Sequence, residues 1–150
     1  MPANIYTPAD AQAILQRIQS ISDESVRQWG RMSAPEMLWH CRQQMEFVLS
    51  KQEIKVMKTI YRYQPLKWLI IFAMPWPKES PTAASIDAKK VNPQLGDTAT
   101  EKDKLLQSLS LVMQAEQVQP NHPLFGSLSK HDWGCLIYKH LHHHLRQFSC

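Results

Sequence analysis

The fold is decided by residues 129–148, SKHDWGCLIYKHLHHHLRQF. Ser129 followed by Asp132 is typical of a helix start, because a serine side chain accepts a hydrogen bond from the first turn and an acidic group stabilises that turn. The pattern predicts a helix over about residues 130–147. At about 100° per residue, one face of this helix carries Trp133, Ile137, His140, His144 and Phe148. We expect this face, with its two imidazoles, to be buried.

Two histidines of the buried face, His140 and His144, are four residues apart. Side chains at this spacing are neighbours on a helix and can share one metal ion, as the two histidines of an HExxH metalloprotease helix do. On the same helix His142 points roughly opposite, and His143 lies at the edge of the buried face. The alternative is a pair of hydrogen-bonded core histidines, and the spacing alone leaves both interpretations open.

The best third ligand is His40, which lies in another clearly signalled helix. Ser33 and Glu36 form a capping-box pattern that begins this helix, predicted over residues 34–50. His40 falls on the flank of its apolar face rather than at the centre. Three imidazoles from two helices are a donor set typical of a catalytic metal site.

Two more helices are predicted from apolar residues at helical spacing, one over residues 8–21 and one over about 100–116. No stretch alternates cleanly at the period of a strand. The sequence therefore predicts an all-α chain, a mainly antiparallel helical bundle made of a single domain, residues 1–150. A long, ordered, proline-rich loop over residues 75–97 is expected between the second and third main helices.

Composition narrows the class of protein. With 43% apolar and 20% charged residues, the chain is typical of a globular protein. It has no glycine-rich phosphate-binding string, and its net charge of +4 comes with no base-stacking motif, so dinucleotide and nucleic-acid binding are disfavoured. The three cysteines lack CxxC spacing, which favours a reducing, cytoplasmic location. The longest apolar run, residues 68–74, is too short for a membrane span.

A basic segment follows the second helix. Lys51, Lys55, Lys58 and Arg62 recur at helical spacing, so residues 51–63, if helical, form an amphipathic helix with one basic face. Such a charged face is most often simply solvated, so we predict no binding to anionic vesicles. The apolar residues after this segment are expected to serve as core or as a wall over the metal site.

Motifs at the two ends of the chain resemble one family. Residues 29–40, WGRMSAPEMLWH, together with HPLFG at 122–126 and YKHLHHHLRQF at 138–148, are similar to the DUF1569 family of the DinB/YfiT-like superfamily. The resemblance implies a DinB-like four-helix bundle that holds a divalent metal ion. Its implied ligands are His40, His140 and His144.

The resemblance says more about the site than about the reaction. The family is of unknown function, and related superfamily members include metal-dependent thiol S-transferases and a mycothiol-dependent maleylpyruvate isomerase. The chain departs from the family pattern at His142, where an acidic residue is usual, and at Ser149, where glycine is usual. Neither position belongs to the implied ligand set.

Together these features favour a metal-dependent enzyme with a small-molecule substrate. A divalent ion held by three neutral imidazoles keeps open positions, at which water or a low-molecular-weight thiol is activated for hydrolase or thiol S-transferase chemistry. Zinc, nickel and iron all suit imidazole, and a homodimer is compatible with the sequence. Glu36, Tyr138 and His143 are candidates for positioning or proton transfer.

The alternative is a non-enzymatic binding protein whose basic amphipathic helix, residues 51–62, engages an anionic surface or a partner.

Overall fold

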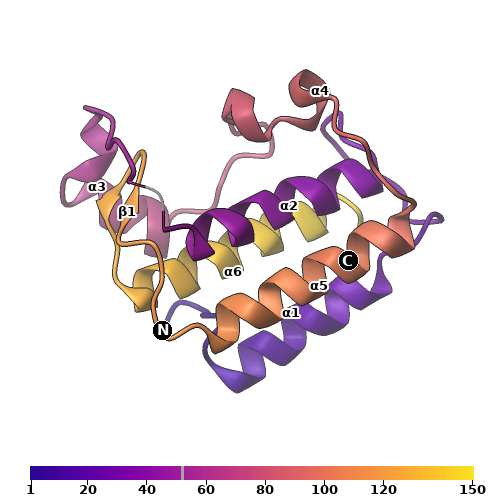
Figure 1. The fold of residues 1–150 in the computed structure, drawn as a ribbon, viewed down its shortest axis with the longest axis horizontal. Coiled ribbons are helices and arrows are strands. Elements are labelled where there is room, and N and C mark those ends of the chain that lie inside the picture. Colours follow the sequence, from indigo (N-terminus) through magenta and orange to yellow (C-terminus); the bar gives the residue numbers. More distant parts are fainter. Residues whose placement is uncertain (52) are drawn as a thin grey trace.

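The structure is a computed structural model that describes residues 1–51 and 53–150, and it is mostly helical. Its elements are α1 (Pro8–Ser20), α2 (Ala34–Leu49), the 3₁₀ turn η1 (Ile60–Arg62), α3 (Leu66–Trp68), the π-helical η2 (Leu69–Ala73), the 3₁₀ turn η3 (Ala84–Ile86), α4 (Ala88–Val91), α5 (Thr98–Gln114), β1 (Asn121–His122), β2 (Gly126–Ser127) and α6 (Lys130–Arg146) (Figure 1). Among the described residues, the sheet is limited to the antiparallel pair β1–β2. The predicted all-α class is confirmed.

Both capping boxes predicted from the sequence form. The Glu36 amide donates to Ser33 Oγ (3.4 Å), and the Ser33 amide donates to Glu36 Oε2 (2.7 Å). Ser129 and Asp132 make the equivalent pair at the start of α6, with distances of 3.1 and 2.9 Å. Side chains thus satisfy backbone donors at the N-termini of α2 and α6. These caps determine where the two helices that carry the histidines begin.

The long helices surround one apolar core. Helix α2 packs against α5 and α6, and α1 packs against the same two helices, so the four close around a common interior (Figure 1). Among the core side chains that solvent barely reaches are Ile14, Ile18, Leu38, Met45, Leu105, Leu109, Trp133 and Ile137. Burying each large side chain of this kind contributes about 1.5–3 kcal/mol. The core therefore holds α2 and α6 as neighbours.

The amphipathic helix considered for residues 51–63 does not form in the part of this segment that the structure describes. Residues 51 and 53–59 are not helical, and the only helical residues there are the single 3₁₀ turn of η1. The four cations of the segment therefore do not form one face of a helix, and Gln52 lies outside the described residues. The binding-protein alternative, which depends on that amphipathic helix, loses its basis.

Tertiary hydrogen bonds explain why this helix does not form. The Met57 amide donates to the Pro123 carbonyl (2.8 Å), and the Thr59 hydroxyl donates to the Leu124 carbonyl (3.0 Å). The segment thus bonds to the turn between β1 and β2, and the hydrogen bond within it, from the Thr59 amide to the Met57 carbonyl (2.9 Å), spans two residues and not the four of an α-helix. Ile54 and Val56 add to this preference, because branching at Cβ lowers helix propensity.

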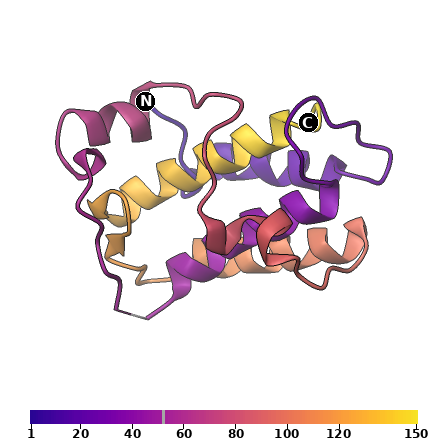
Figure 2. The ribbon, with the colours of Figure 1, turned by 90° about the horizontal axis from the view of Figure 1, so that it is seen from above.

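The predicted loop over residues 75–97 contains two short helices, η3 and α4. Asp87 caps α4 by accepting a hydrogen bond from the Lys89 amide (3.0 Å), and Asn92 ends it in the left-handed region at φ 49°. The chain before η3 runs across α6, as Figure 2 shows. The loop consequently lies over the helices that carry the histidines.

The apolar run of residues 68–74 forms the end of α3 and all of η2. Ile71 is buried in the core, whereas Trp68 and Met74 are about half exposed. No helix in the described residues is long and apolar enough to cross a membrane.

Candidate metal centre

Three buried histidines meet between α2 and α6. His40 projects from α2, and His140 and His144 project from successive turns of α6. None of the three is more than 7% exposed, and one ring nitrogen from each lies within 4.8 Å of the others. The structure therefore brings together the three residues singled out from the sequence. This histidine cluster comprises His40, His140 and His144.

The Nδ1 atom of each ring in the histidine cluster is hydrogen-bonded to an oxygen. His40 Nδ1 lies 2.8 Å from the Ile86 carbonyl oxygen. His140 Nδ1 lies 2.7 Å from Gln44 Oε1, and His144 Nδ1 lies 2.6 Å from Gln147 Oε1. The Ile86 carbonyl can only accept, so His40 Nδ1 carries the proton, and the placement of Oε1 in Gln44 and Gln147 gives His140 and His144 the same tautomer. A neutral imidazole in this tautomer leaves Nε2 as a bare lone pair, which is the form that binds a metal ion.

Two of these lone pairs face each other. His40 Nε2 and His140 Nε2 are 2.8 Å apart, and neither nitrogen has a hydrogen to donate when its Nδ1 is protonated. Opposed acceptors at this distance repel unless a cation lies between or beside them. The arrangement fits a bound divalent ion, whereas an ordinary core pair of histidines would have one donor and one acceptor.

Burial keeps the cluster neutral. Desolvation lowers the pKa of His40, although the Ile86 carbonyl and the Asp87 carboxylate partly oppose it. Desolvation, with the neighbouring imidazoles, lowers the pKa of His144 to about 3 and the pKa of His140 well below its ordinary value. Neutral imidazole is the form that ligates, so at pH 7 no proton competes with a metal ion for these nitrogens.

In the metal-free protein, the free energy of unfolding should fall as the pH is lowered from 7 to 5.5. The cluster histidines stay neutral in the folded state, because their pKa values are lowered there, whereas the unfolded chain takes up protons near pH 6.5. The unfolded state then binds more protons, so stability rises with pH in this window by up to about 1.4 kcal/mol per pH unit for each histidine. Urea unfolding in the presence of a chelator measures this slope.

The matched control for the pH experiment is His131→Gln, since His131 is exposed on α6. This variant should keep the slope of the free energy of unfolding against pH. A free energy of unfolding that does not change between pH 7 and 5.5 would contradict the neutral, buried cluster.

Two glutamines orient the rings and were not assigned a role from the sequence. Gln44 lies four residues after His40 on α2, and Gln147 lies three residues after His144 at the end of α6. Both spacings place a side chain beside a histidine on a helix. A glutamine one turn away from His40 and from His144 was thus the available signal, although Gln44 bonds across to His140 rather than to His40.

Replacing Gln44 with alanine should lower the affinity for a divalent metal by about 10- to 100-fold, because partners of this kind fix the orientation and basicity of a ligating imidazole. The control is Gln43→Ala, one residue earlier, where the side chain donates to Glu46 on the surface (3.3 Å). Competition with a chromogenic chelator measures both affinities. Equal affinities in the two variants would show that Gln44 does not support His140.

The remaining histidines have other partners. His142 Nδ1 accepts a hydrogen bond from Arg17 (2.8 Å), and His142 does not belong to the histidine cluster. His122 Nδ1 accepts from the backbone amides of the β1–β2 turn, and burial lowers its pKa to about 4. His143 is half-buried beside His144, with ring centroids 5.1 Å apart.

Of the three residues considered for positioning or proton transfer, only His143 borders the histidine cluster. Glu36 is engaged in its capping box and in an ion pair with Lys89 (2.8 Å). Tyr138 stacks on His142, with ring centroids 6.2 Å apart. Geometry thus favours His143 over the other two.

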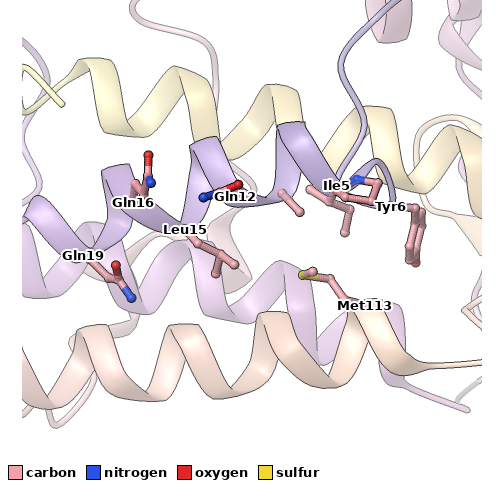
Figure 3. Close-up of a pocket in the computed structure, with 9 residues that line it drawn as sticks. Ile5, Tyr6, Gln12, Leu15, Gln16, Gln19 and Met113 are labelled. Atoms are coloured by element: carbon pink, nitrogen blue, oxygen red, sulfur yellow. The ribbon is translucent and has the colours of Figure 1, made fainter.

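Two cavities differ in their relation to the cluster. A cavity of about 560 Å³ lies between α1 and α5, and its lining contains no histidine and no charged residue. Figure 3 shows its apolar side chains, among them Leu15 and Met113, with the amide of Gln12 nearby. A second cavity, of about 320 Å³, lies against α6 and is lined by Trp76 and His143, both of which contact the cluster. Only the second is placed to serve a reaction at the histidines.

These observations define the class: a mostly helical protein with three neutral histidines buried between two of its long helices. The chain belongs to the DUF1569 family, whose family model matches residues 6–150. The description of this family is "Protein of unknown function (DUF1569)". No curated protein and no solved structure matches the chain. The resemblance to DUF1569 seen in the sequence is confirmed, and activity has to be inferred from the site.

Proposed function

We propose that this protein is a metal-dependent enzyme with a DinB-like fold. In this proposal α1, α2, α5 and α6 form the four-helix bundle of a single domain, and His40, His140 and His144 hold one divalent ion through Nε2. The observation that carries the proposal is the pair of opposed Nε2 atoms of His40 and His140, 2.8 Å apart. Zinc, nickel and iron all fit a set of three imidazoles.

The chemistry that such an ion supplies when bound is a lowered pKa for water or for a low-molecular-weight thiol, which makes either a nucleophile at neutral pH. The chain's own residues hold and shield the site. The Nδ1 hydrogen bonds to Ile86, Gln44 and Gln147 keep the rings in one tautomer and orientation. Trp76, whose ring centroid lies 5.9 Å from that of His140, packs beside the cluster and would limit the access of water to it.

The substrate in this proposal is a small molecule, and the reaction is of the hydrolase or thiol S-transferase type. The cavity of about 320 Å³ beside the cluster falls in the size range of small-molecule sites. Cys41, Cys135 and Cys150 are free thiols, which supports a reducing, cytoplasmic location.

Metal analysis and activity assays test the proposal in two steps. Untagged protein purified without added metal should contain close to one divalent ion per chain by elemental analysis. The metal-loaded protein should then accelerate either the hydrolysis of 4-nitrophenyl acetate or the conjugation of glutathione to 1-chloro-2,4-dinitrobenzene, relative to His140→Ala. Equal rates for wild type and His140→Ala in both assays would count against these two kinds of chemistry.

A further inference from the structure

The cavity of about 320 Å³ has one apolar and one polar wall. The apolar wall is the chain from η2 onward and includes Ile71, Phe72, Met74 and Trp76. The polar wall is a face of α6 that carries Tyr138, Lys139, His142, His143 and Arg146. We call this cavity the α6 groove. Its two walls suit a ligand with an apolar body and a polar end.

The polar end of that ligand is expected to be an anion. Two cations, Lys139 and Arg146, line the α6 groove, and no acidic residue lines it. The Lys139 ammonium is anchored by donating to the carbonyl oxygens of Ile70 and Ile71, so its charge is held at the wall. The Arg146 backbone carbonyl accepts from the Ser149 amide (3.4 Å), but the Arg146 side chain makes no hydrogen bond or ion pair within the described part of the chain, so its guanidinium is available to a ligand.

The α6 groove shares its inner wall with the histidine cluster. The Trp76 ring centroid lies 5.9 Å from that of His140 and 6.0 Å from that of His143. The His143 ring in turn lies 5.1 Å from the His144 ring. One layer of side chains therefore separates a molecule in the groove from the proposed metal ligands. The Trp76 indole is held in this place by its hydrogen bond to the Ile70 carbonyl (3.3 Å).

We propose that the α6 groove binds a small organic acid, with its carboxylate on Arg146 and its apolar or aromatic body against Trp76, which lies beside His143, three residues before Arg146 on α6. A guanidinium matches a carboxylate with two parallel hydrogen bonds, and an indole face accommodates an aromatic ring. That this acid is the substrate rests on the proposed function. Its binding in the groove does not, because none of the groove contacts requires a metal ion.

Isothermal titration calorimetry with benzoate tests the groove, in chelator-treated protein and in protein loaded with zinc. Benzamide, the neutral counterpart, tests the need for charge, and inorganic phosphate tests the need for an apolar body. Benzoate should bind both forms of the protein. Benzamide should bind at least tenfold more weakly because it loses the charged hydrogen bond. Phosphate should bind at least tenfold more weakly because it has no ring to bury.

Variants assign the binding to Arg146. We expect Arg146→Gln to weaken benzoate binding about tenfold and Arg146→Lys to weaken it less, since lysine keeps the charge but not the two-pronged geometry. Lys58→Gln removes the same charge from an exposed residue outside the groove and should leave the affinity unchanged. Unchanged affinity in Arg146→Gln would overturn the proposal, as would equal binding of benzamide or of phosphate.

The two forms of the protein separate this inference from the proposed function. If the protein takes up no metal yet binds benzoate in a way that depends on Arg146, the groove inference stands and the metal-enzyme proposal fails. If benzoate binds only the zinc-loaded form and Arg146→Gln does not weaken it, the acid binds at the ion and the groove inference is wrong.

Discussion

The His140→Ala variant should lose the bound divalent metal, with an affinity at least about a hundredfold below that of the wild type. Loss of an orienting partner alone costs about 10- to 100-fold, and loss of a ligand costs more. The two remaining rings, His40 and His144, come from different helices and keep only two of the three donors. His40→Ala and His144→Ala should behave in the same way. Elemental analysis after dialysis against a fixed low concentration of zinc measures the occupancy of each variant.

His142→Ala is the matched control, because His142 lies on the same helix but bonds to Arg17 instead of joining the cluster. It should keep the occupancy of the wild type. The same occupancy in all four variants and the wild type would eliminate the three-histidine site. Reduced occupancy in His142→Ala alone would place the metal on the outer face of α6.

Removing the metal should lower Tm by roughly 10 °C. A ligand that binds only the folded state, at about a thousand times its Kd, stabilises that state by about 4 kcal/mol, and each kcal/mol shifts Tm by about 2–4 °C in a domain of this size. The structural cause is the opposed nitrogens of His40 and His140, which are left without a cation between them. Differential scanning calorimetry with and without chelator measures the shift.

The control for this experiment is His144→Ala, which should melt at the same temperature with and without chelator. The wild type should recover its higher Tm when zinc is added back in excess over the chelator. A wild-type Tm that is unchanged after elemental analysis has confirmed metal removal would show that the cluster does not hold the ion.

The parts of the site that were predictable are those specified by local sequence. The capping boxes at Ser33 and Ser129 fix the starts of α2 and α6, and helical periodicity then places His140 and His144 on the buried face. His40 could be assigned to its helix in the same way. Its meeting with the other two depends on the packing of α2 against α6, for which family resemblance was the stronger guide.

The parts that were not predictable depend on contacts between distant segments. The Ile86 carbonyl that orients His40 is a backbone atom in a loop, and a backbone acceptor has no residue type to reveal it. The segment around Met57 has helical spacing, yet its amide bonds to Pro123, so a tertiary contact overrides the local pattern. The α6 groove is likewise formed by residues from two parts of the chain, and neither part shows it alone.

The histidine cluster joins two parts of the chain that are far apart, since His40 and His140 are separated by 100 positions. His140 and His144 become neighbours as soon as one helical turn forms, which takes about 0.1–1 μs in isolated helical peptides. His40 joins the other two only when the chain between His40 and His140 closes into a loop. The entropy lost in closing this loop must be offset by native packing. In the proposed metal site, the nascent chain would therefore offer two histidine ligands before it offers all three. Under the proposed function, tight retention of a metal ion during biosynthesis would therefore indicate that α2 and α6 have packed together.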